Sequence, residues 1–126
     1  MIWNWKTCRL YLEDKSVPWK PGVVPRKGNN ESKLHYLLKL KVCLLLAEKG
    51  GKYEDFVVEA KIKDGGRYDI IVPLAHEIYE ITVSETKKEL VELKKFPTGF
   101  RVFMVEGSNG IPIITDVSGE VKYGKL

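Results

Sequence analysis

Two acidic residues, Asp69 and Glu80, lie in stretches that are typical of neighbouring β-strands. Asp69 opens an apolar, β-branched run, and Glu80 lies inside an alternating run from residue 77 to residue 84. Carboxylates that are brought side by side on adjacent strands offer the oxygen ligands that a hard divalent cation prefers. A Mg²⁺ or Mn²⁺ ion bound by both acids could polarise a phosphate oxygen and lower the pKa of an attacking water.

Strand geometry predicts which side chains accompany the two acids. Residues two apart point to the same face of a sheet, so Glu80 and Thr82 are expected to face the site while Ile81 packs away from it. Asp69 on the adjacent strand can then lie beside Glu80. The alternative is a pair of acids at a sheet end that are exposed and merely solvated.

A predicted helix adds three polar side chains on one of its faces. Glu31, His35 and Lys39 follow the spacing i, i+4, i+8, which aligns them along the helix. Glu31 can add a third acid to the metal site, His35 could act as a proton shuttle or phosphate contact, and Lys39 could neutralise phosphate charge. The alternative is an ordinary helix surface with i, i+4 pairs.

The apolar patterns predict a mixed α/β domain in which helices flank a central mixed β-sheet. The first helix should run from about residue 31 to residue 49, capped by Asn29 or Asn30 and ended by Gly50 and Gly51. Three strands in a meander should follow, at 53–62 and around Asp69 and Glu80. A second helix at 84–96, capped by Ser84, and strands at 100–105 and 111–117 complete the order. Residues 5–12 are undecided between strand and helix, and 13–29 are expected to form a loop.

Composition bounds the class of protein. The chain has 126 residues, 44% of them hydrophobic, which suits a single domain spanning 1–126. It contains no apolar run of the roughly 18 residues that a membrane span needs and no signal-peptide pattern. Cys8 and Cys43 are far apart, so we expect reduced thiols, a cytoplasmic location and a core role for Cys43. The 30% of charged residues leans toward a thermophilic source.

The positive charge is concentrated near the start of the chain. Residues 1–29 carry six basic and two acidic side chains, which equals the whole net charge of +4, and they also contain Trp3, Trp5, Tyr11 and Trp19. Basic residues interleaved with aromatic ones suit a nucleic-acid backbone and exposed bases. The alternative is an ordinary solvated loop with core tryptophans.

Taken in order, these motifs resemble the PD-(D/E)XK nuclease superfamily. Within it the pattern is most similar to CoiA-like competence nucleases, and small archaeal or viral nuclease-like proteins share the architecture. The resemblance covers about residues 30–105. The matching residues are Glu31, His35, Lys39, Glu59, Arg67, Tyr68, Asp69, Glu80, Ile81, Thr82 and Ser84.

The resemblance implies a restriction-endonuclease-like core and a Mg²⁺- or Mn²⁺-dependent nuclease that hydrolyses phosphodiester bonds in DNA. Asp69, Glu80 and the Ile81 carbonyl would hold the cation, with Glu31 in support. Lys39 or another lysine would contact the scissile phosphate. A homodimer is also expected. The residues expected to contact the nucleic acid are His35, Arg67, Lys87 and Lys88.

Thr82 departs from the family pattern, which has a lysine two positions after the second acid. CoiA-like proteins usually carry Gln there, and a lysine from elsewhere (Lys39, Lys61, Lys87 or Lys88) could substitute. A second register, Glu59-Ala60-Lys61, restores the lysine but lacks a convincing Asp strand before it. The alternative function is a catalytically inactive nucleic-acid-binding protein on the same fold, and a third is a structural or interaction protein.

Overall fold

A computed structural model of the chain describes residues 17–18, 31–53, 56–61, 67–83, 87–107 and 109–124. Apart from residues 17–18, the basic and aromatic segment 1–29 lies outside this part, and so does the undecided element at 5–12. The predictions made for those residues therefore stay predictions.

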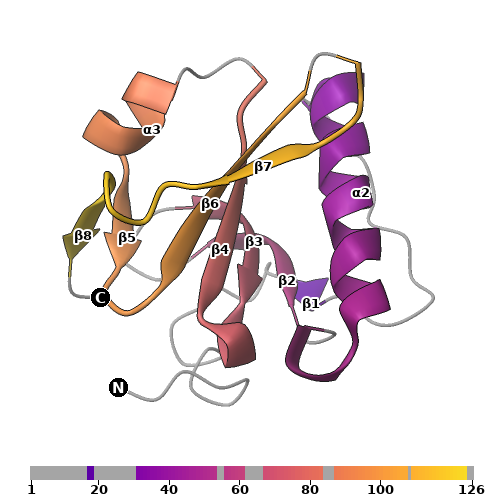
Figure 1. Cartoon of the computed structure of the whole chain (residues 1–126), viewed down its shortest axis with the longest axis horizontal. Coiled ribbons are helices and arrows are strands. Elements are labelled where there is room, and N and C mark those ends of the chain that lie inside the picture. The colour runs from indigo at the N-terminus through magenta and orange to yellow at the C-terminus, as the bar shows by residue number, and fades with distance from the viewer. Residues whose placement is uncertain are drawn as a thin grey trace.

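The described residues form a mixed six-stranded sheet with the order β1-β2-β3-β4-β6-β7 (Figure 1). Strands β4 and β6 run parallel, and the other neighbouring strands run antiparallel. Strands β5 and β8 form a separate parallel pair. The predicted meander is confirmed as β2, β3 and β4. The strand bounds are β1 Val17–Pro18, β2 Val57–Lys61, β3 Arg67–Val72, β4 Glu77–Ile81, β5 Lys95–Pro97, β6 Arg101–Glu106, β7 Ile113–Asp116 and β8 Lys122–Gly124.

Two helices, α2 (Lys33–Lys49) and α3 (Lys87–Leu93), cover opposite faces of the sheet (Figure 1). Side chains of β4 alternate between two cores, because successive residues of a strand point to opposite faces. Ile78 packs in the cluster that contains Leu90 of α3, whereas Tyr79 and Ile81 pack in the cluster that contains Leu38 of α2. The predicted α/β class, with helices flanking a mixed sheet, is confirmed. Neither described helix is long and apolar enough to cross a membrane.

The N-terminal cap of α2 differs from the prediction, and its C-terminal end agrees with it. Ser32 is the N-cap, and its Oγ accepts a hydrogen bond from the His35 N–H at 3.0 Å, so the predicted cap at Asn29 or Asn30 is wrong. Ser is among the preferred N-cap residues. The predicted C-terminal end is confirmed, because Gly50 closes the helix with φ 69°, a conformation that glycine adopts without steric cost. Cys43 is buried in the core, as expected.

Two element boundaries differ from the sequence-based expectation. A 3₁₀ turn at Gly51–Tyr53 precedes β2, which therefore begins at Val57 rather than at residue 53. The second helix ends at Leu93, since residues 95–97 form β5 and Phe96 pairs with Tyr123. Phe96 is buried in the core on the α3 side. Its strand partner lies far along the chain, so local periodicity could not reveal the pairing.

Candidate functional site

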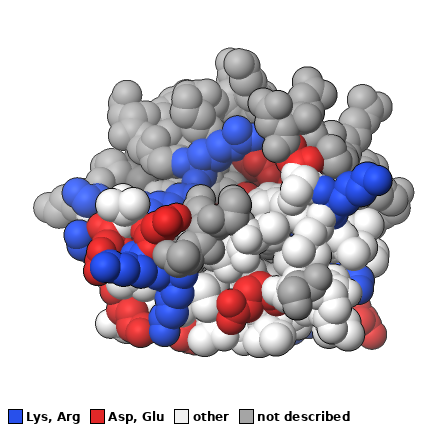
Figure 2. Space-filling model, turned by 90° about the horizontal axis from the view of Figure 1, so that it is seen from above, with Lys and Arg blue, Asp and Glu red and all other residues white. Residues whose placement is uncertain are grey.

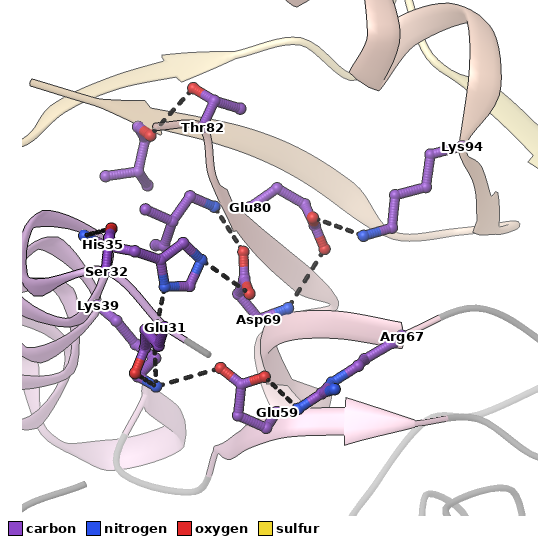
Figure 3. Close-up of polar contacts among 12 residues, drawn as sticks. Glu31, Ser32, His35, Lys39, Glu59, Arg67, Asp69, Glu80, Thr82 and Lys94 are labelled. Carbon is purple, nitrogen blue, oxygen red and sulfur yellow. Dashed lines mark hydrogen bonds and ion pairs between the residues drawn. The ribbon is translucent and has the colours of Figure 1, made fainter. Parts of the chain in front are cut away.

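Asp69 and Glu80 lie where β3 and β4 separate. The ladder between these strands pairs Ile71 with Ile78 and Ile70 with Tyr79, and the next residues are Asp69 and Glu80. There, the two side chains bond across to the backbone (Figure 3). The Ile81 N–H donates to Asp69 Oδ2 at 2.8 Å, and the Asp69 N–H donates to Glu80 Oε1 at 3.3 Å. Two carboxylates are thus inserted into the fork between the strands.

The Glu80 carboxyl is buried and has a lysine beside it. Its side chain is 4% exposed, and Lys94 Nζ lies 2.7 Å from Glu80 Oε2. Lys94 also lies over the ring of Tyr68, 5.2 Å from the centroid. Burial and, to a smaller extent, the nearby Asp69 carboxylate raise the pKa of Glu80 to about 8. Lys94 offsets only part of this rise. The fork is therefore short of positive charge.

Asp69 is connected to α2 through His35. His35 Nε2 lies 3.3 Å from Asp69 Oδ1, and His35 Nδ1 forms an ion pair with Glu31 Oε2. The hydrogen bond with Asp69 raises the pKa of His35 to about 9, with a further contribution from Glu31, against the opposing effect of burial. The imidazole is therefore cationic at neutral pH. It can donate a proton, and it positions Asp69 through a charged hydrogen bond.

Lys39 is enclosed by acids. Its side chain is 1% exposed, and its Nζ lies 2.9 Å and 2.8 Å from the two oxygens of Glu31 and 3.1 Å from Glu59 Oε1. Burial alone would lower the pKa of Lys39, but the bonds to Glu31 and Glu59 outweigh it and raise the pKa. All three ammonium hydrogens can be satisfied by these oxygens. The structure places Lys39 as a buried link between α2 and β2 rather than at a phosphate.

Glu59 joins this network from β2, although the sequence assigned it no clear role. It has a positive φ of 52° and lies between the pairs Val58–Ile70 and Ala60–Tyr68, at the level of Asp69. Residues other than glycine reach this region at a cost of about 1 kcal/mol or more, and such residues cluster at functional sites. Its second oxygen accepts a hydrogen bond from Arg67 at 2.8 Å (Figure 3).

Several predicted site residues lie in other settings. Thr82 directly follows β4, and both its N–H and its hydroxyl donate to the Val105 carbonyl, at 2.9 Å and 3.3 Å. Arg67 is exposed apart from its pair with Glu59. On α3, Lys87 pairs with Glu120 at 3.0 Å and Lys88 is exposed.

The lysine that the structure brings to Glu80 is Lys94, which no motif in the sequence had singled out. Four lysines lie in the predicted second helix and its end, and nothing in their spacing distinguishes the one that reaches the fork. Only the path of the chain after Leu93 selects it. These lysines are Lys87, Lys88, Lys94 and Lys95.

Within the described ranges, no group of three or more His, Cys, Asp or Glu side chains is arranged to hold a metal ion. The donors at the fork are the two carboxylates of Asp69 and Glu80. Their chemistry suits Mg²⁺, which is commonly bound through one or two carboxylates and keeps several waters. Each of the four carboxylate oxygens has one donor from the protein and a second lone pair available. The donor type therefore fits a hard divalent cation.

The protonation of Glu80 and His35 predicts a stability that falls as pH rises. The pKa of Glu80 rises from 4.5 to about 8 and that of His35 from 6.5 to about 9 on folding, so the folded state binds more protons across these windows. The stabilisation from His35 is complete below about 6.5 and is lost as pH passes about 9, while Glu80 becomes a penalty between about 4.5 and 8. Urea unfolding at a series of pH values should show the decline, on the order of 1.4 kcal/mol per pKa unit. The His35→Gln variant should decline less steeply between about pH 6.5 and 8, where Glu80 still contributes, and should lack the decline between about pH 8 and 9. An unchanged slope in that variant would contradict this assignment.

Comparison with known proteins adds no relative. No protein-family model matches the chain, and neither the curated proteins nor the solved structures contain a match.

Proposed function

We propose that this chain is a metal-dependent nuclease that hydrolyses phosphodiester bonds in DNA, with Asp69 and Glu80 holding a divalent cation. The observation that carries the proposal is the insertion of these two carboxylates into the fork between β3 and β4. Burying one acid beside another is unfavourable unless positive charge compensates. Lys94 lies beside Glu80 and His35 lies beside Asp69, so each acid has one cationic side chain as a partner, and a divalent cation would add compensating charge for the pair.

The residues that would hold the ion are Asp69 and Glu80, with the Ile81 carbonyl as a further candidate. When bound, Mg²⁺ or Mn²⁺ polarises a phosphate oxygen and acidifies a water. The protein orients the ligands: the Ile81 N–H and His35 position the Asp69 carboxylate, while Glu31 holds His35. Such second-layer contacts fix ligand geometry and tune ligand basicity.

Lys94 supplies the positively charged side chain that is missing at Thr82. The Lys94 side chain is 26% exposed, and its ammonium lies beside Glu80 at the edge of the fork, so Lys94 can reach solvent as well as the carboxylate. A lysine in this position can neutralise charge on a phosphate bound at the cation. Lys39, by contrast, is buried among its acidic partners. We therefore assign the role of the family's motif lysine to Lys94.

Cleavage assays with matched lysine variants test the proposal. The purified protein should cut or nick DNA in Mg²⁺ or Mn²⁺ and lose this activity with EDTA. Lys94→Met should lower the rate by about 100-fold or more, because a preorganised charge at the reacting phosphate is worth that much. Lys122→Met, which removes an exposed lysine of β8, is the control and should cleave normally. Equal rates in both variants would contradict the role of Lys94.

A catalytically inactive nucleic-acid-binding protein is the second candidate, and the position of Thr82 favours it. Thr82 stands where the nuclease motif usually has its lysine, and a threonine carries no charge. Its hydroxyl donates a hydrogen bond to the Val105 carbonyl. Such a protein would bind DNA with a steep dependence on salt and would not require metal. Calorimetric titration with Mn²⁺ separates the two candidates: absence of both metal binding and cleavage, with DNA binding retained, supports the second.

A further inference from the structure

Helix α2 has an apolar outer face in addition to its buried one. Leu38, Val42 and Leu46 point into the core, as one face of a helix on a sheet should. Leu37, Leu44 and Leu45 nevertheless remain 39%, 56% and 43% exposed. Their spacing, i, i+7 and i+8, puts them on one stripe together with Lys41 and Glu48 at i+4 and i+11. We call this set the outer stripe: Leu37, Lys41, Leu44, Leu45 and Glu48.

The outer stripe continues into an apolar hollow beside β7. A pocket of about 280 Å³ lies between Leu45 of α2 and Ile114 of β7, with Tyr79 in its lining. Ile111, Ile113 and Ile114 are all exposed at 41% or more. In Figure 2 the uncharged groups occupy most of the lower right of the molecule, the side on which α2 lies in Figure 1. A pocket bordered by several exposed apolar side chains is typical of an interaction site.

The edge of the sheet lies on the same side. β7 is the last strand in the order of the six-stranded sheet, and its four residues are exposed. A strand in this position offers unpaired backbone groups to another chain. The apolar stripe, the pocket and the sheet edge therefore lie next to one another in the described part of the chain.

We propose that a second copy of this chain covers the outer stripe, with the two α2 helices antiparallel about a twofold axis near Leu44 and Leu45. A twofold interface must be complementary to itself, so residue pairs occur in both directions. With the axis near residues 44 and 45, Lys41 of each copy faces the partner's Glu48, and the leucines meet between these pairs. The opposite charges at equal distances from the centre of the stripe supply that self-complementarity.

The hydrogen bond that Lys41 makes within its own chain is compatible with this arrangement. Lys41 Nζ donates to the Gly110 carbonyl at 2.5 Å, which holds the ammonium at the border of the stripe and leaves two of its hydrogens for acceptors on a second copy. The pocket beside Leu45 provides room for an aliphatic side chain of the partner. This inference does not depend on the proposed nuclease activity, because none of the outer-stripe residues belongs to the fork between β3 and β4.

Sedimentation and light scattering of the whole chain test the proposal. The wild-type protein should be a dimer that dissociates on dilution, and Leu44→Glu should be a monomer with an unchanged circular dichroism spectrum. The matched control is Leu93→Glu, which alters the 81% exposed leucine at the end of α3 and should leave the dimer intact. A wild-type monomer at the highest soluble concentration would overturn the proposal, and so would a Leu44→Glu variant that remains dimeric.

Charge reversal tests the orientation of the two helices. Lys41→Glu and Glu48→Lys should each weaken the dimer at least several-fold, since each places like charges together. The double variant Lys41→Glu/Glu48→Lys should restore the wild-type dissociation constant, because the pair is then reversed on both sides of the axis. Failure of the double variant to recover, with both single variants weakened, would overturn the antiparallel arrangement.

Discussion

The Asp69→Asn variant is expected to lose metal-dependent cleavage by more than about 100-fold, because even partners of metal ligands are worth 10- to 100-fold. The fold should survive, since an Asn side chain can still accept the hydrogen bond that the Ile81 N–H donates to Asp69 Oδ2. Manganese affinity, measured by calorimetry, should fall together with the rate. These joint losses would follow from removing one of the two carboxylates that the described residues place at the fork.

The pKa of His35 tests the role of Asp69 without an activity assay. The hydrogen bond with Asp69 is the largest cause of the raised His35 pKa, so Asp69→Asn should lower that pKa, as an NMR titration of the imidazole would measure. Asp116→Asn is the matched control, because Asp116 is an exposed acid at the end of β7 bonded to Ser118. It should change neither quantity. Cleavage that persists in Asp69→Asn would exclude the proposed metal site, whatever the behaviour of His35.

Lys39→Met is expected to lower the free energy of unfolding by about 3 kcal/mol, the usual cost of removing one partner from a buried ion pair. Met keeps the length of the side chain, so the loss comes from charge rather than from a cavity. Without the ammonium, Glu31 keeps His35 as a cationic partner and Glu59 keeps Arg67, but the hydrogen bonds from Lys39 to Glu31 Oε1 and Glu59 Oε1 are lost. Urea denaturation at neutral pH measures the change.

The matched control for Lys39 lies on the same helix. Lys33 is exposed in the first turn of α2, and Lys33→Met should change stability by no more than about 0.5 kcal/mol. A loss below about 1 kcal/mol for Lys39→Met would show that Lys39 does not stabilise the junction of α2 with β2. Adding Glu31→Gln to Lys39→Met should recover part of the loss, because the two residues interact directly and their effects should not add.

Local patterns in the sequence were sufficient for the main elements. The leucine spacing predicted α2, Gly50 marked its end, and the apolar runs predicted the meander of β2, β3 and β4. These features depend on neighbours within a few residues of the chain, since periodicity and caps are local. The pairing of β5 with β8 was missed for the same reason, because Phe96 and Tyr123 meet only in the folded chain.

At the proposed site too, the sequence predicted some features and the tertiary structure decided the others. The sequence by itself singled out Asp69 and Glu80, because acids inside apolar strands are unusual. It also predicted that Glu31, His35 and Lys39 share one helix face, but only His35 and Lys39 lie on α2, since Glu31 precedes the N-cap Ser32. Only the tertiary structure decided what each of them contacts: it enclosed Lys39 between acids and tied Thr82 to Val105.

Lys94 was chosen by tertiary structure alone. It reaches Glu80 from the segment after α3, on the face of the sheet opposite to His35. A residue's type and spacing determine which face of its own element it occupies. Which charge meets it there depends on how separate elements pack and where burial removes water, and these are properties of the whole fold.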